Sequence, residues 1–186
     1  MAHTKVYREA AEKLKTSCPY SRIYWDEFDY GLLDQIRTVK RPSKRDNSKA
    51  YNDIIIMLDT ESSKDHKPKN RKDIAENHIV VWTISLRAYH PNMVTLYGRS
   101  PADAAACIKK IHESMQGDVT VFYVHNLGWD WTFLRQFIMA EIGTPKKQLN
   151  VKPYYPINIE FKNGIILKDS LILAQRKLEY GQRILM

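Results

Sequence analysis

Residues 119–134 read VTVFYVHNLGWDWTFL, and this stretch decides the fold. Its first six residues are almost entirely apolar and β-branched, which predicts a buried strand. The apolar positions Leu134, Phe137 and Ile138 then recur at helical spacing, and this predicts a helix over residues 131–142 that Gly143 ends. A strand followed directly by a helix requires a crossover connection back to the sheet, so the stretch predicts an α/β fold.

The segments upstream predict further strands of the same sheet. Residues 54–58, IIIML, form a short β-branched run that stops at an acidic cluster, as expected of a buried strand that ends at a polar rim. Residues 78–89 and 93–98 predict two more strands, and their short join at His90-Pro91-Asn92 favours an antiparallel pair.

Helix and turn signals complete the pattern. Ser100-Pro101 opens a predicted helix that ends at Gly117 and whose inward stripe is Ala104, Cys107, Ile108, Ile111 and Met115. Asn163-Gly164 predicts a hairpin turn, and residues 171–185 predict a last helix. Three strands, a helix, a strand and another helix is the order expected of a ribonuclease-H-like mixed sheet with flanking helices.

The first 50 residues have a different character, and the sequence predicts a boundary near Tyr51. Residues 1–50 are expected to form a helical and basic extension, and residues 51–186 the sheet domain. Residues 4–16 have helical spacing. Residues 37–49 are rich in basic side chains, and this basic arm is either a solvated linker or a segment that contacts phosphates; its basic residues include Lys40, Arg41, Lys44 and Arg45.

Composition narrows the class of protein. The 186 residues carry 29 Lys and Arg against 21 Asp and Glu, a net charge of +8, which favours a polyanionic partner such as nucleic acid. The longest apolar stretch, residues 54–58, is too short to cross a bilayer, and the N-terminus lacks a secretory signal. Cys18 and Cys107 suit a reducing compartment and form no metal-type pair. We therefore expect a soluble cytoplasmic protein that has no membrane partner.

Two clusters of polar residues follow the predicted strands. Asp59-Thr60-Glu61 can direct two carboxylates toward one point, which suits divalent cations, although a solvated strand end would have the same pattern. His125, Asn126 and Asp130 follow the next strand, where Asn126 or Asp130 could instead cap the helix.

The order of these motifs resembles the exonuclease domain of the protein-primed family B DNA polymerases of phages, adenoviruses and organellar linear plasmids. The resemblance covers residues 54–173. Asp59 and Glu61 match the first exonuclease motif, and residues 126–130, NLGWD, match the second. After Lys168-Asp169, the segment SLILA at residues 170–174 is similar to a Ser/Thr-Leu-x-x-hydrophobic motif, which in the family contacts single-stranded DNA and the terminal protein primer.

The resemblance implies a proofreading 3′ to 5′ exonuclease that uses two Mg²⁺ or Mn²⁺ ions. Asp59 would bridge both ions, Glu61 would hold the ion that activates water, and Asp130 would hold the other through water. Asn126 would orient the terminal nucleotide, and Trp129 would stack on the frayed base unless its ring packs internally. Ser62, Ser170 and Leu171 would be further DNA contacts, and His125 is expected to fix the turn. We expect Asp59, Glu61 and Asp130 to converge on one cleft, and the second acid-x-acid triplet, Glu27-Phe28-Asp29, to lie elsewhere.

The family's third motif, Tyr-x-x-x-Asp, is expected beyond Leu173, and Tyr180 is followed four residues later by Ile184. The sequence therefore predicts an exonuclease domain truncated at its C-terminus, weakly active or inactive alone, whose partners are single-stranded DNA, the terminal protein and the remainder of the polymerase. It would act in the host cytoplasm if viral, or in an organelle. The alternative is a non-catalytic module that binds single-stranded DNA or terminal protein. A ribonuclease-H-like nuclease unrelated to polymerases would need a further downstream carboxylate.

Overall fold

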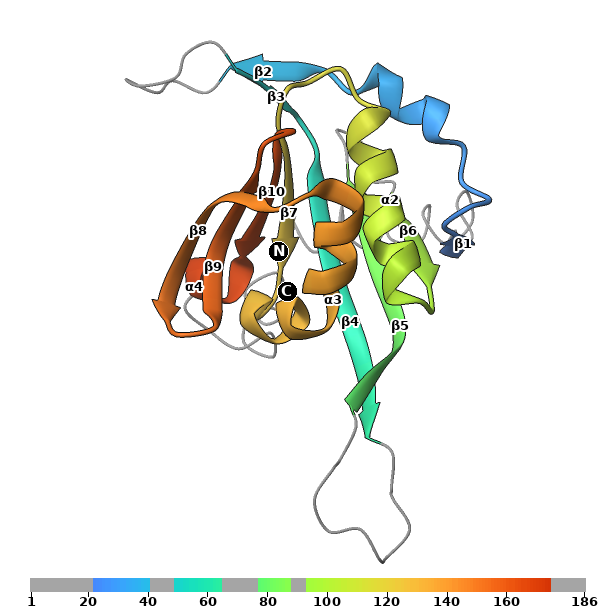
Figure 1. Cartoon of the computed structure of the whole chain (residues 1–186). Helices are drawn as coiled ribbons and strands as arrows, with labels where there is room; N and C mark the ends of the chain where they lie inside the picture. Colours follow the sequence, from blue (N-terminus) through green and yellow to red (C-terminus); the bar gives the residue numbers. More distant parts are fainter. Residues whose placement is uncertain (1–21, 41–48, 65–76, 88–92, 175–186) are drawn as a thin grey trace, which may run out of the picture.

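The computed structural model describes residues 22–40, 49–64, 77–87 and 93–174, and the main element of the fold is one large sheet (Figure 1). This sheet has eight strands: β1 (Arg22–Tyr24), β4 (Ile55–Lys64), β5 (Asn77–Arg87), β6 (Met93–Gly98), β7 (Thr120–Val124), β8 (Pro145–Lys152), β9 (Tyr155–Phe161) and β10 (Ile165–Asp169). A separate two-stranded ribbon pairs β2 (Thr38–Lys40) with β3 (Ala50–Asn52).

Two long helices, α2 (Pro101–Glu113) and α3 (Leu127–Ile142), lie side by side against one face of the sheet (Figure 1). The described residues also form a short 3-10 helix, η1 (Tyr30–Gln35), and one turn of helix, α4 (Ser170–Ala174). No helix in the described ranges is long and apolar enough to span a membrane.

The strands lie in the order β1-β6-β5-β4-β7-β10-β9-β8. β5 is antiparallel to its neighbours β4 and β6, whereas β7 is parallel to both β4 and β10. The antiparallel pairs β4–β5, β5–β6, β8–β9 and β9–β10, together with the parallel pairs β1–β6, β4–β7 and β7–β10, make the sheet mixed, and the predicted α/β class is confirmed.

Several local predictions are confirmed. β5 and β6 pair antiparallel, and Ser100 caps α2 by accepting a hydrogen bond from the Ala102 N–H, with Pro101 as the first helical residue. The predicted inward stripe of this helix is buried. Gly164 has φ 97°, the left-handed backbone that the predicted hairpin turn between β9 and β10 requires.

Three boundaries differ from the prediction, and one strand was missed. α2 ends at Glu113, before the predicted stop at Gly117, so that Met115 of the predicted stripe lies just beyond the helix. α3 begins at Leu127, four residues before the predicted start, because the turn after β7 contains only two residues. β8 was not predicted, since the lysine-rich, exposed PKKQLNVK has no alternation and becomes a strand by pairing with β9. β4 continues through Lys64 instead of ending at Leu58, because β5 stays paired with it over this length. The helix expected over residues 171–185 is described only as far as Ala174.

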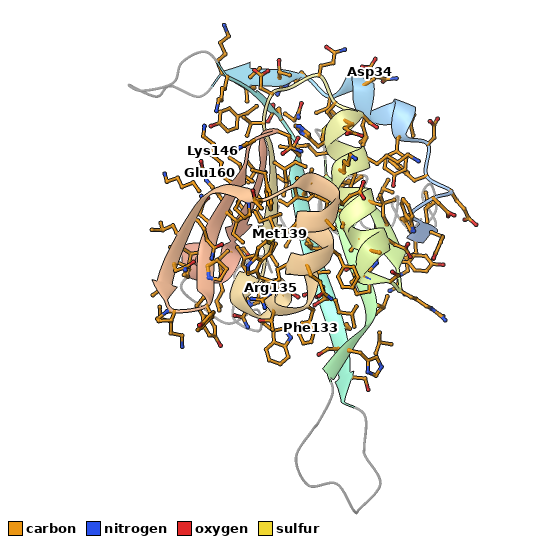
Figure 2. The ribbon with its side chains drawn as sticks, in the orientation of Figure 1. Asp34, Phe133, Arg135, Met139, Lys146 and Glu160 are labelled. Atoms are coloured by element: carbon orange, nitrogen blue, oxygen red, sulfur yellow. The ribbon has the colours of Figure 1, made fainter. Side chains whose placement is uncertain are left out.

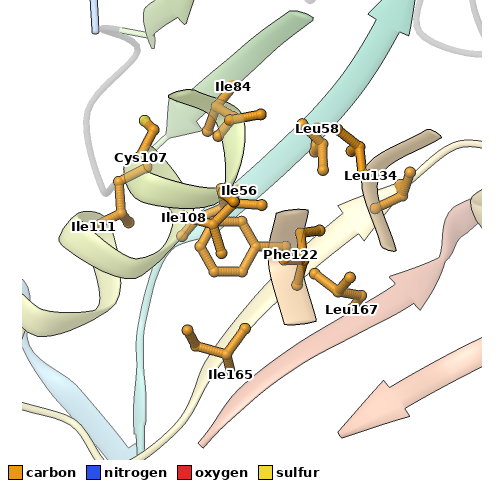
Figure 3. Packing of buried hydrophobic residues seen from close by; sticks show 14 of the residues in the cluster. Ile56, Leu58, Ile84, Cys107, Ile108, Ile111, Phe122, Leu134, Ile165 and Leu167 are labelled. Carbon is orange, nitrogen blue, oxygen red and sulfur yellow. The ribbon is translucent and has the colours of Figure 1, made fainter. Parts of the chain in front are cut away.

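The hydrophobic core lies between the sheet and the two long helices (Figure 3). On β4 the residues alternate, so that Ile56 and Leu58 are almost completely buried while Ile55 and Met57 are exposed. Phe122 from β7 lies at the centre of this core and is fully buried. One face of β4 is therefore packed against the helices and the other is exposed, whereas β7 is covered on both faces, with Val121 buried on the face opposite to Phe122.

The described part of the N-terminal segment, which the sequence analysis assigned to a separate extension, packs into this same core. β1 adds a parallel strand beside β6, and Tyr30 and Leu33 of η1 are buried. The Tyr30 hydroxyl lies 3.5 Å from the Cys107 sulfur of α2 and donates a 2.7 Å hydrogen bond to the Trp25 carbonyl. Aromatic residues on this segment supply the apolar area that joins it to the sheet. The helix expected at residues 4–16 lies outside the described residues.

The alternation on β4 gives a matched stability test. Ile56→Val removes a methyl group from a site with 0% exposure and should lower the free energy of unfolding by about 0.5–1.5 kcal/mol. The same change at Ile55, which is 52% exposed, should alter it by less than about 0.5 kcal/mol. Urea denaturation of both variants checks this, and equal losses would contradict the assignment of the two faces.

Candidate active site at the carboxyl edge of the sheet

The register of the three central parallel strands brings the polar motifs to one edge of the sheet. Leu58 on β4 pairs with Val124, the last residue of β7, and Val124 pairs with Asp169, the last residue of β10. Asp59, His125 and Ser170 each follow one of these three partners. Segments far apart in the sequence therefore meet at the carboxyl edge of β7 and β10.

The two acids of the first motif lie inside a strand and not at its end, which corrects the prediction. Asp59 pairs with Thr83 and Glu61 with Val81, and the register shifts between Glu61 and Ser62. Asp59 and Glu61 are both exposed, on the open face of the sheet, and Ser62 is half-buried. The expectation that the two carboxylates share one face is met, because side chains two residues apart on a strand point the same way.

Asp130 occupies the other side of β4. Its side chain is only 2% exposed and accepts a hydrogen bond from the Thr60 hydroxyl. Thr60 stands between the two acids of the first motif, but alternation turns it toward the helices. The first turn of α3 thus holds the Asp130 carboxylate against the strand that carries Asp59 and Glu61.

Burial makes the Asp130 carboxyl group harder to ionise. The pKa of Asp130 is raised to about 7: desolvation by burial is the largest cause, the negative charges of Asp59 and Asp169 also raise it, and the hydrogen bond from Thr60 lowers it. The electrostatic interaction of three acids from β4, β10 and α3 is consistent with their approach to one edge. In the part of the chain that the structure describes, no group of three or more His, Cys, Asp or Glu side chains is arranged to hold a metal ion.

Asn126 precedes α3 in a left-handed conformation, with φ 63° and ψ 55°, and its side chain makes no capping hydrogen bond. Asparagine adopts this conformation more readily than most residues. The helix-capping alternative for Asn126 is therefore wrong, and its amide is not engaged at the N-terminus of the helix. Asn126 and His125 are both half-buried at the turn.

Asp169 supplies the missing cap from another strand. Its carboxylate accepts hydrogen bonds from the N–H of Leu127, the first residue of α3, at 3.1 Å and from the N–H of Leu171 in α4 at 2.8 Å. Sequence reasoning gave Asp169 no role. An acid directly before a helical Ser-Leu is a recognisable N-cap signal for α4, but the contact with α3 has no local signature.

The predicted DNA-contacting residues differ in accessibility. Trp129 is 43% exposed and its ring meets Phe133 edge-to-face, with 5.3 Å between centroids, so it is not a core tryptophan. Figure 2 shows Phe133, the ring that Trp129 contacts, on the side of α3 away from Lys146 and Glu160. Ser170 and Leu171 are half-buried at the start of α4.

The described part of the basic arm, residues 37–40 and 49, lies at the opposite end of the sheet. Lys40 is exposed on β2, whose partner β3 reaches the amino end of β7 through the bridge between Tyr51 and Val119. Figure 1 shows this ribbon at the top and the start of α3 near the bottom. Arg41, Lys44 and Arg45 lie outside the described residues. Asp29, of the second acid-x-acid triplet, caps η1 by accepting from the Gly31 N–H at 3.0 Å.

Comparison with known proteins adds no relative, since no protein-family model, curated protein or solved structure matches this chain.

The buried carboxyl group of Asp130 gives a pH-dependent prediction. The pKa of Asp130 is higher in the folded than in the unfolded chain, so the protonated carboxyl group stabilises the fold. This stabilisation is complete below about pH 4 and is lost as the pH rises through about 7. With cations chelated, Asp130→Asn should therefore be more stable than the parent at pH 8.5, by roughly 1–4 kcal/mol, and should lose that advantage at pH 4. Urea denaturation across this range checks it, and a difference independent of pH would contradict it.

The double acceptor role of Asp169 gives a second prediction. In Asp169→Asn one oxygen becomes an NH₂ group that cannot accept, so one of the two N–H groups loses its partner. The free energy of unfolding should fall by about 1–3 kcal/mol. Asp29→Asn is the matched control, because Asp29 is exposed and accepts from the Gly31 N–H, a hydrogen bond that the side-chain oxygen of asparagine can also accept. Equal losses in the two variants would contradict the role of Asp169.

Proposed function

We propose that this chain is the proofreading 3′ to 5′ exonuclease portion of a protein-primed family B DNA polymerase, built on a ribonuclease-H-like sheet. The strand order supports the proposal: β6, β5 and β4 follow one another as antiparallel neighbours, and β7 and β10 extend the sheet in parallel with β4. Along the chain, β4, β5, β6, α2, β7 and α3 also follow the order of three strands, a helix, a strand and a helix expected from the sequence.

A single observation carries the proposal, namely the common register of Leu58, Val124 and Asp169. It brings the first motif, the second motif and the Ser-Leu segment to one edge, although their positions in the sequence are far apart. Ligand sites of open α/β sheets lie at the carboxyl ends of parallel strands, where loops and helix N-termini meet.

The side chains at this edge suit hydrolysis of a terminal phosphodiester bond. Asp59 and Glu61 would hold divalent cations, because their carboxylates are exposed on one face and Mg²⁺ and Mn²⁺ prefer oxygen ligands. Bound cations would supply an activated water and stabilise charge on the leaving oxygen. Asn126, which makes no cap bond, would donate to the terminal nucleotide, and the exposed face of Trp129 would stack on its base.

One observation favours the alternative of a non-catalytic module that binds single-stranded DNA. Asp130 is buried and already bonded to Thr60, and it lies on the face opposite to Asp59 and Glu61. Ionisation and a change of the Asp130 side-chain rotamer would be needed before it could join the other two acids. The same surface residues, Trp129 and Asn126, would bind a strand without cleaving it.

Replacement of Asp59 separates these functions. The parent should release 3′ nucleotides from a single-stranded oligonucleotide slowly and only with Mg²⁺ or Mn²⁺. Asp59→Ala should reduce the rate by about a hundredfold or more, because the remaining groups cannot position the water. Mn²⁺ should raise the melting temperature of the parent and leave that of Asp59→Ala unchanged.

Glu27→Gln is the matched control, because Glu27 is an exposed acid in the second acid-x-acid triplet, and it should behave like the parent. An equal Mn²⁺ response in the parent and Asp59→Ala would contradict the metal site. DNA binding with neither nucleotide release nor a Mn²⁺ response would establish the binding module.

A further inference from the structure

An exposed hairpin tip lies beside the candidate active site and has no role in the function proposed above. We define the hairpin tip as residues 152–155, Lys-Pro-Tyr-Tyr, which join β8 to β9. β9 runs antiparallel to β10 and Lys168 pairs with Asn158, so β9 begins where β10 finishes. The hairpin tip is therefore at the same edge of the sheet as Asp169 and Ser170, beside the first turn of α3 (Figure 1).

A close contact ties the hairpin tip to the second motif. A Cβ atom on Gly128 would come within 2.6 Å of Cδ1 of Tyr155, so the Tyr155 ring packs directly on the backbone of α3. Gly128 precedes Trp129, and the rings of Tyr155 and Trp129 are both 43% exposed. Two accessible aromatic rings thus flank one glycine at the start of the helix.

The hairpin tip also carries a third ring and a positive charge. Tyr154 is 82% exposed with φ 64°, and among the described residues no ring or cation contact involves it. The Lys152 ammonium lies 4.1 Å from the centre of the Tyr155 ring. Residues 143–157 contain three lysines and no acid, so this surface is complementary to a polyanion.

We propose that the hairpin tip binds single-stranded DNA, with Tyr154 stacking on a base and Lys152 contacting a phosphate, on the strand whose 3′ end enters the candidate active site. Exposed rings interleaved with cations bind single strands without sequence preference, since every base presents a π face. A duplex hides its base faces and gains only the contact with the phosphate. The direction of the DNA strand rests on the proposed function, whereas binding of DNA to the hairpin tip is tested separately.

The test measures binding of a fluorescein-labelled oligothymidylate by anisotropy, with Ca²⁺ in place of Mg²⁺. Tyr154→Asn removes the ring and keeps a residue that tolerates the left-handed backbone. It should weaken binding by about tenfold, the lower part of the range measured for one stacked base, while Tyr154→Phe should bind like the parent. Binding of a duplex of the same length should be unchanged in both variants.

Two matched controls lie on the same hairpin. Leu149→Ala removes an exposed apolar side chain from β8, and should leave affinity within about twofold of the parent. Lys152→Gln should weaken binding and its salt dependence more than Lys147→Gln, because Lys147 lies toward the base of the hairpin, 3.9 Å from Glu160.

The outcomes distinguish this inference from the proposed function. If Trp129→Ala weakens binding and Tyr154→Asn does not, the hairpin tip has no role and the proposed function stands. If Tyr154→Asn weakens binding while the parent neither cleaves DNA nor responds to Mn²⁺, the hairpin tip binds the strand and the exonuclease proposal fails. If the parent does not bind the oligonucleotide, both are wrong.

Discussion

The parallel pairing of β7 with β4 on one side and β10 on the other is the constraint on which the rest of the structure depends. Side chains alternate along a strand, so a slip of one residue would turn Phe122 from the core to the opposite face. The same slip would separate Leu58, Val124 and Asp169 and remove the common edge. Core packing and the arrangement of the polar motifs are therefore fixed by one register, and burial of the apolar side chains selects it.

Asp169 links this register to the helices. Because the Asn126 side chain makes no cap, the N–H of Leu127, the first residue of α3, needs a partner from outside its own turn. One carboxylate from the end of β10 accepts from α3 and α4 together. The two turns that carry the second motif and the Ser-Leu segment are thus held at a set distance by a charge-assisted contact, which is stronger than a neutral hydrogen bond.

The two ends of the sheet carry different chemistry. The β2–β3 ribbon with Lys40 lies at the amino end of β7, while the acids, Trp129 and the hairpin tip lie at the carboxyl end. The described part of the basic arm therefore lies too far from the candidate site to contribute positive charge there. Lys152 lies closer to the candidate site than Lys40 does. It is the last residue of β8, a strand without an amphipathic pattern.

The sequence by itself determined the elements whose signals are local. The β-branched run of β4, the helical stripe of α2 and the turn at Asn163-Gly164 depend on residues within a few positions of one another, and so does the shared face of Asp59 and Glu61. Only the tertiary structure decided that β1 joins the sheet and that β8 is a strand. It also decided that β4 extends beyond its parallel pairing with β7, and that Asp130 turns toward Thr60. Each of these depends on a partner distant in sequence, because a strand edge or a buried carboxylate is stabilised by groups that the fold, and not the neighbouring sequence, brings into hydrogen-bonding range.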